Sequence, residues 1–183
     1  LCNNTGDHNT AIGHSSLFSN TTGTCNAALG NFSLCASTTA NYNVALGSEA
    51  MRNNTTGGSN AAIGYKALLN NTTGACNTAV GYAAGLANTS GIANTAVGNS
   101  SSINNTTGSS NTAIGLRSLY TNTTGSNNTA SGYQALYYNS TSSNNTASGY
   151  RSLYYNTTGD HDVAMGFKSL CSNTTACYNS AIG

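Results

Sequence analysis

The sequence predicts an all-β protein, a parallel β-solenoid in which one 17-residue coil repeats about eleven times and no helix forms. Three observations lead to this prediction. An Ala-x-Gly string returns every 17 residues without insertion or deletion, from Ala11-Ile12-Gly13 to Ala181-Ile182-Gly183. Charged residues make up only 5% of the chain, whereas roughly 25% is usual. Asn, Thr, Ser and Gly dominate, and these residues are poor helix formers.

The repeat length favours one turn of a solenoid per repeat. Two-helix repeats need about 33 residues and leucine-rich repeats at least about 20. We therefore expect each coil to hold two short strands joined by two turns. In-register pairing of coils explains the constant period, because one extra residue would flip every following side chain to the other face. We expect residues 1–183 to form a single continuous array and, because it begins partway through a repeat, to be a segment of a longer fibre.

The first expected strand follows position 13, when each coil is numbered 1–17 so that it ends at the repeated glycine. Position 13 is Asn in ten coils and Asp162 in the other. Stacked Asn side chains can hydrogen-bond along the array as a ladder. Position 15 is always Ala and position 17 always Gly, so this face of the strand should lie close to another segment. Position 16 is mostly Ile, Val, Leu or Met and should point the other way.

The second expected strand lies near positions 3–6 and contributes one large apolar side chain per coil. Position 4 is Leu or Met in eight of ten coils, with Gly85 and Ser102 as exceptions. Such a core is thin, and the strand at positions 14–16 looks buried on both faces. We expect the outer face to pack on neighbouring chains, most simply in a parallel homotrimer. The alternative is a monomeric roll whose position-16 side chains fill its own interior.

Positions 7–9 read Asn-x-Thr or Asn-x-Ser in ten of the eleven coils, and only Ser37 interrupts the series. This is the acceptor pattern for N-linked glycosylation in a secreted protein. Asn-Thr-Thr-Gly is also good turn chemistry, so a purely structural role is the alternative. The ten candidate sites are Asn3, Asn20, Asn54, Asn71, Asn88, Asn105, Asn122, Asn139, Asn156 and Asn173. Secondary acceptor patterns begin at Asn31, Asn53, Asn70, Asn99, Asn104, Asn127 and Asn144.

The six cysteines are irregularly spaced and form no C-x-x-C metal pattern. Cys171 and Cys177 flank one turn and could close a local disulfide, while Cys25 and Cys35 could join adjacent coils. Two such disulfides would indicate an oxidising compartment, and buried free thiols are the alternative. Cys2 and Cys76 lie about four coils apart, too far for a bridge at strand spacing.

The acidic residues and histidines of the sequence predict no catalytic site, no cofactor and no metal site. Asp7-His8 and Asp160-His161-Asp162 are the only clusters of acid and histidine, and they fit solvated turns better than a metal centre. Four carboxylates in all leave no paired acid and base. A net charge of +1 disfavours nucleic acid as a partner, and no apolar run is long enough for a membrane helix.

We expect the side chains at positions 1, 2, 5 and 6 to be exposed. Position 2 holds Lys66, Arg117, Arg151 and Lys168, and the tyrosines at positions 1, 5 and 6 include Tyr133, Tyr137, Tyr138, Tyr150, Tyr154 and Tyr155. Tyr and Arg are common in binding hot spots, so this surface could contact sugars or proteins. Lateral packing between chains or fibres is the alternative.

The string Asn-Thr-Ala-Ile-Gly, at residues 9–13 and 111–115, resembles the head repeats of trimeric autotransporter adhesins. The longer string Gly-Tyr-x-Ala-Leu-x-x-Asn-Thr-Thr-Gly at residues 64–74 is similar to repeats of viral tail-fibre shafts and large bacterial surface proteins. The resemblance spans the whole chain and implies a left-handed β-roll, trimeric association and surface attachment. The adhesin coils are usually a few residues shorter, and the surplus here falls in the Asn-Thr-Thr-Gly turn.

These observations together predict a structural extracellular fibre or surface adhesin segment, located outside a cell or on a virion, and not an enzyme. Expected partners are copies of the chain itself, as a homotrimer or an end-to-end filament, and surface glycans or host receptors. A glycan- or ice-binding solenoid is the alternative, since regularly spaced Thr can order water. Thr72 and Thr73 are adjacent, however, and should point in different directions. A disordered spacer is a third hypothesis.

Overall fold

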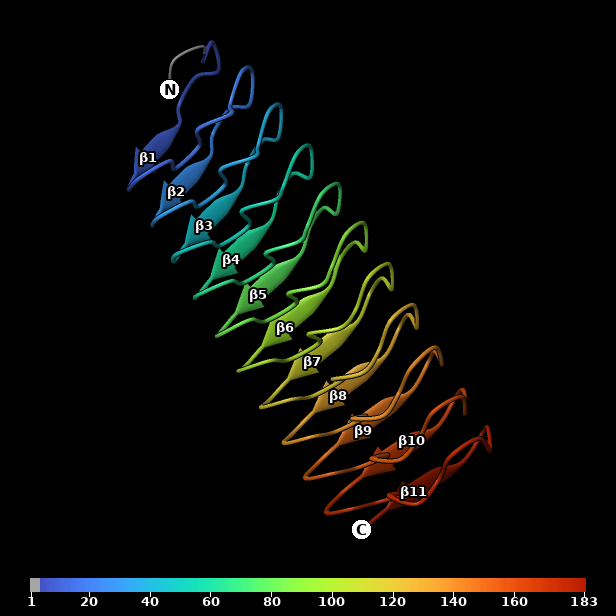
Figure 1. Ribbon diagram of the computed structural model, residues 1–183. Helices are drawn as coiled ribbons and strands as arrows, with labels where there is room; N and C mark the ends of the chain where they lie inside the picture. Colours follow the sequence, from blue (N-terminus) through green and yellow to red (C-terminus); the bar gives the residue numbers. More distant parts are fainter. Residues whose placement is uncertain (1–3) are drawn as a thin grey trace.

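The computed structural model describes residues 4–183 as one stack of coils, with a single three-residue strand in each. The strands pair in parallel and in sequence order to form one sheet, from β1 at one end to β11 at the other (Figure 1). They are β1 Thr10–Ile12, β2 Ala27–Leu29, β3 Val44–Leu46, β4 Ala61–Ile63, β5 Thr78–Val80, β6 Thr95–Val97, β7 Thr112–Ile114, β8 Thr129–Ser131, β9 Thr146–Ser148, β10 Val163–Met165 and β11 Ser180–Ile182. The predicted all-β parallel solenoid is confirmed.

The register between neighbouring strands is the sequence period itself. Ala62 of β4 pairs with Ala79 of β5, which pairs with Ala96 of β6. Every other strand pair follows the same 17-residue step, so equivalent positions form straight rows along the stack. The constant period seen in the sequence therefore reflects unbroken in-register pairing. No helix long and apolar enough to cross a membrane occurs in residues 4–183.

The second strand predicted near positions 3–6 is wrong, because this segment forms a layer of turns. Positions 2 and 4 have left-handed backbones, as at Lys66 with a φ of 58° and Leu68 with a φ of 49°. Alternation between left-handed and ordinary residues breaks the extended conformation that a strand requires. The layer is still bonded from coil to coil, since the Leu68 amide donates to the Ala84 carbonyl over 3.0 Å. We call this segment the turn layer.

The core lies between the sheet and the turn layer. The position-15 alanines point inward from the sheet and meet the position-4 side chains, such as Leu68, from the opposite side. Position 16 points outward, so the alternative in which position-16 side chains fill the interior is wrong. Two apolar clusters make up the core, and they are separated in the coil where Ser102 replaces leucine.

The repeated glycine at position 17 makes the corner between the sheet and the turn layer. Gly64 has a φ of 131°, a conformation that L side chains rarely adopt. A Cβ atom at Gly64 would also overlap the carbonyl oxygen of Gly81 in the next coil. The corner glycines therefore stack in direct backbone contact, which explains their presence in every coil.

Candidate binding surfaces

The asparagines at position 7 form a ladder inside the protein. Nδ2 of Asn71 donates to Oδ1 of Asn54, one coil earlier, over 2.8 Å, and to the Gly74 carbonyl over 2.9 Å. The asparagines at position 13 form a second ladder, in which the Asn60 amide donates to Oδ1 of Asn43 over 2.9 Å and Nδ2 donates to the Gly74 carbonyl over 2.9 Å. The two ladders thus meet at the position-10 carbonyls and satisfy polar groups that water cannot reach.

This burial argues against glycosylation at eight of the ten candidate sites, because a glycan on Nδ2 would have to displace the ladder bonds. The eight buried asparagines are Asn20, Asn54, Asn71, Asn88, Asn105, Asn122, Asn139 and Asn156. Asn173, in the last coil, is partly buried and donates to the Asp162 carboxylate over 2.9 Å. Asn3 lies outside the described residues. Exposed secondary acceptors are Asn31, Asn53, Asn99, Asn104, Asn127 and Asn144, and Asn70 is half-buried.

Ser37 interrupts the position-7 ladder. Among the described residues, Oδ1 of Asn20 and Oγ of Ser37 are two of three buried polar atoms without a hydrogen-bond partner. Position 10 of this coil is Ala40, whereas it is glycine in most coils. A Cβ atom at the equivalent Gly23 would overlap Oδ1 of Asn20. The methyl group of Ala40 therefore occupies space that an asparagine in place of Ser37 would need.

Neither predicted disulfide is present. Cys25, Cys35, Cys171 and Cys177 are all free. In each predicted pair, the position-5 cysteine lies on the turn layer, and the other lies on the segment that leads into the next strand. The buried core separates these two sides of the coil. Cys177 instead accepts a hydrogen bond from the Asp160 amide at 3.2 Å. Cys2 lies outside the described residues, and Cys76 is a free, exposed thiol.

The acid and histidine clusters belong to the turns. Asp162 replaces asparagine in the position-13 ladder, where it is buried and accepts from the Asn179 amide at 2.8 Å. Asp160 accepts from the Ser143 amide at 2.6 Å, and His161 stacks on Tyr178. Within residues 4–183, no three His, Cys, Asp or Glu side chains gather closely enough to hold a metal ion.

The outer face of the sheet is uncharged, and its position-16 side chains are apolar except for Ser131 and Ser148. None of the eleven strands contains a charged residue. Side chains of β1–β3, including Ile12, Leu29 and Leu46, line a shallow groove of about 270 Å³. The exposed apolar side chains of this face are Ile12, Leu29, Val44, Leu46, Ile63, Ile114, Val163, Met165 and Ile182. An exposed apolar surface of this extent is typical of an interaction site.

The Thr-Thr turn forms the narrow edge of the stack opposite the corner glycines. Oγ1 of Thr72, at position 8, donates to the Thr89 carbonyl of the next coil over 3.0 Å. The amides of Thr72, Thr73 and Gly74 donate to the same carbonyl. Position 9 is exposed in every described coil and is threonine in all but one, where Ser90 replaces it. These threonines are Thr5, Thr22, Thr39, Thr56, Thr73, Thr107, Thr124, Thr141, Thr158 and Thr175.

In the last coils, aromatic rings gather on the turn layer at positions 5 and 6 and beside it at position 1. We define the aromatic patch by the following eight residues. They are Tyr120, Tyr133, Tyr137, Tyr138, Tyr150, Tyr154, Tyr155 and Phe167. The Arg151 guanidinium lies over the rings of Tyr150 and Tyr154, at 5.3 and 5.0 Å from their centroids, and bonds to Gln134. Burial raises the pKa of Tyr137 and of Tyr154 above the ordinary value of a phenol.

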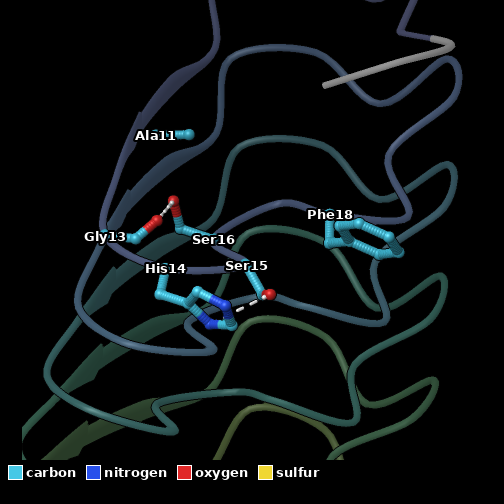
Figure 2. A pocket seen from close by; sticks show the side chains of 6 residues that line it. All are labelled: Ala11, Gly13, His14, Ser15, Ser16 and Phe18. Carbon is cyan, nitrogen blue, oxygen red and sulfur yellow. Dashed lines mark hydrogen bonds between the residues drawn. The ribbon is translucent and has the colours of Figure 1, made fainter.

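A hollow of about 500 Å³ lies at the first coil, beside Ala11, Ser16 and Phe18. Figure 2 shows the His14 ring beside Ser15, whose Oγ lies 3.2 Å from Nδ1, while Ser16 bonds to the Gly13 carbonyl. These residues belong to the surface on which, in every later coil, the preceding coil packs. The hollow is therefore a stacking surface of the solenoid and contains no converging catalytic groups.

No protein-family model, curated protein or solved structure matches the chain.

Proposed function

We propose that the chain is a structural shaft element of an extracellular or surface fibre, and not an enzyme. The observation that supports this role most directly is the unbroken stacking of equivalent coils. Each coil is joined to the next by backbone bonds on both layers and by the position-13 ladder, and the position-7 ladder adds a further bond except at Ser37. The described array is about 50 Å long at roughly 4.8 Å per coil. A rod built in this way is stiff, and it lengthens by adding coils without changing its cross-section.

Self-association through the outer face of the sheet is part of this proposal. The face carries a row of exposed apolar side chains, among them Leu46 and Ile63, and no charge to oppose the approach of a second copy. Parallel copies would cover this face along the whole rod, and a homotrimer is the simplest closed arrangement. The resemblance of the repeats to adhesin heads and tail-fibre shafts supports the same role in surface attachment.

Two experiments test the shaft role. In a fusion in which residues 14–183 follow Gly183 directly, the 17-residue period continues, so electron microscopy should show a straight rod of about 100 Å. One alanine inserted at the junction should produce a kink or two separate short particles. If the in-register fusion also gives two separate particles, the chain does not extend as a shaft. Immunogold labelling of source material should then place the rod on external filaments, and exclusively internal label would contradict an extracellular fibre.

A second candidate function is ice binding by the threonine edge. The position-9 hydroxyls form a row at strand spacing, and among those of the described residues only the Thr5 hydroxyl donates to another part of the chain, the Thr21 carbonyl at 3.1 Å. Only one of the two threonines is free in this way, because the position-8 hydroxyl is bonded to the backbone. Thermal hysteresis that is lost when Thr56, Thr73 and Thr107 are changed to Lys would support ice binding. Absence of thermal hysteresis in the unchanged chain would exclude this function.

A further inference from the structure

The aromatic patch is built from stacks that connect adjacent coils. Tyr137 lies between Tyr120 and Tyr154, with ring centroids 4.9 and 5.3 Å away and interplanar angles of 2° and 25°. A parallel row joins Tyr138 to Tyr155 at 5.6 Å and 5°. Edge-to-face contacts link the two rows, including Tyr138 with Tyr154 at 5.2 Å. The patch therefore holds five tyrosine rings in one continuous set of contacts.

The stacking decides which parts of the rings remain accessible. The face of Tyr137 is covered by its neighbours on both sides, so a sugar cannot stack on it. Ring edges and hydroxyl groups remain at the surface, since Tyr138 and Tyr155 are 40% and 49% exposed. The ring edge contains the carbons ortho to the hydroxyl, where the unpaired electron of a tyrosyl radical is concentrated. The patch thus presents reactive carbons of neighbouring coils side by side.

We propose that the aromatic patch is a site of oxidative tyrosine cross-linking, at which a peroxidase-type oxidant with hydrogen peroxide joins tyrosines of adjacent coils through carbon–carbon bonds. The candidate pairs are Tyr120 with Tyr137, Tyr137 with Tyr154, Tyr138 with Tyr155, and Tyr133 with Tyr150, whose centroids are 5.3 Å apart. This inference concerns a modification of the chain and does not depend on its role as a shaft.

The reaction balances as a two-electron oxidation. Each of two phenols loses one electron and one proton to give a tyrosyl radical. The radicals join at their ortho carbons, and the ring hydrogen at each new bond moves to oxygen through solvent, which restores both phenols. Hydrogen peroxide takes up the two electrons and two protons and becomes two molecules of water. The product has lost two hydrogen atoms.

A cross-link at this site would hold the last coils together covalently. The described cysteines form no disulfide there, so hydrogen bonds and packing alone join these coils. A bond between Tyr137 and Tyr154 would prevent the two coils that it joins from separating.

The test is oxidation of the dilute, folded chain with a peroxidase and hydrogen peroxide, followed by peptide mapping. We expect dityrosine fluorescence in a band of monomer mass, a loss of two hydrogen atoms per bond, and cross-linked peptides from the candidate pairs. Accessibility alone would instead favour Tyr178 and Tyr42, which are 78% and 65% exposed. Products joined only between chains through these two residues would overturn the proposal.

A variant with three tyrosines of one coil changed to phenylalanine, compared with a matched control, tests the proposed pairs most directly. Every stacked pair of tyrosines in the patch includes Tyr133, Tyr137 or Tyr138, so changing all three to Phe removes a reacting partner from each pair while keeping the rings. We expect the yield of intramolecular dityrosine to fall severalfold. The matched control, Tyr42→Phe with Tyr178→Phe, should keep the original yield. Equal yields from the two variants would contradict the proposal, and circular dichroism would show that both retain the fold.

Discussion

Nδ2 of Asn71 donates to Oδ1 of Asn54 across one coil boundary, at 2.8 Å, and both side chains are fully buried. This contact repeats along the stack, so the same amide bonds join one coil to the next and fix the turn of their own coil. The ladder replaces, in a narrow interior, much of the apolar packing that holds larger domains together.

Replacement of Asn71 by alanine should strongly destabilise the rod. The change leaves Oδ1 of Asn54 without this donor and removes one donor from the Gly74 carbonyl. Each buried group that loses its partner costs about 1–3 kcal/mol, so we expect a loss of about 2–4 kcal/mol in the free energy of unfolding. Urea unfolding followed by circular dichroism measures the loss. The control, Asn53→Ala, removes an exposed asparagine and should change stability by less than about 0.5 kcal/mol.

Repair of the ladder at Ser37 should stabilise the protein. In the double variant Ser37→Asn with Ala40→Gly, the new amide can donate to Oδ1 of Asn20, and the glycine provides the space it needs. We expect a gain of about 1 kcal/mol, the usual net value of one buried hydrogen bond. Ser37→Asn alone should gain less, because Ala40 crowds the new side chain. A double variant no more stable than the single one would show that crowding is not the obstacle.

Glycan mapping distinguishes the buried from the exposed acceptor patterns. When the chain is secreted from a host that performs N-linked glycosylation, folded material should carry no glycan at Asn71 or the other buried position-7 sites. Any glycans should occur at exposed acceptors such as Asn104 and Asn127. Enzymatic deglycosylation in heavy-oxygen water, followed by peptide mass spectrometry, identifies each occupied site. A glycan at Asn71 in folded protein would contradict the buried ladder.

Polar substitution on the outer face of the sheet should weaken self-association. Leu46 and Ile63 are 40% and 39% exposed, so Leu46→Thr with Ile63→Thr removes apolar surface while keeping strand-compatible side chains. We expect sedimentation velocity to show a shift towards monomer. The control is Phe18→Thr, which removes an exposed apolar side chain from the turn layer and should leave the distribution unchanged. Equal shifts in both variants would mean that the sheet face is not the interface.

The aromatic patch should make stability depend on alkaline pH. Burial raises the pKa of Tyr137, with a further contribution from Tyr120, and burial also raises that of Tyr154. An unfolded phenol ionises near pH 10, about the usual value. The folded phenols hold their protons to higher pH, so their contribution to stability is present below about pH 10 and is lost as the pH rises through the folded pKa. Above about pH 10, the urea midpoint of the double variant Tyr137→Phe with Tyr154→Phe should fall less steeply with pH than the midpoint of the unchanged chain.

Much of the architecture was predictable from the spacing of Ala79 and its equivalents. The 17-residue step predicted the register, and the alternation of Ala79 and Val80 predicted that their side chains point to opposite faces, but it left open which face is the interior. The turn layer was not predictable in this way. Its left-handed residues include Lys66 and Leu68, which have no intrinsic preference for that conformation, so local composition carries no signal for it.

The position-7 asparagines likewise combine a feature that the sequence predicts, a turn, with one that it does not, their burial. A sequence motif such as Asn71-Thr72-Thr73 is identical whether the asparagine points into solvent or into a ladder, because both environments suit a small polar side chain in a turn. Only the stacking of coils shows that a neighbouring amide lies 2.8 Å away and that water is excluded.

The sequence by itself determined the coil, its length and its gapless repetition. Each of these follows from periodicity, which in-register pairing enforces at every coil. The tertiary structure alone decided which face of the strand is the interior, the burial of the asparagine ladders, the separation of the cysteines predicted to pair, and the stacking of the tyrosines. These depend on which side chains of neighbouring coils meet, and a one-dimensional pattern does not specify the direction in which a turn residue points.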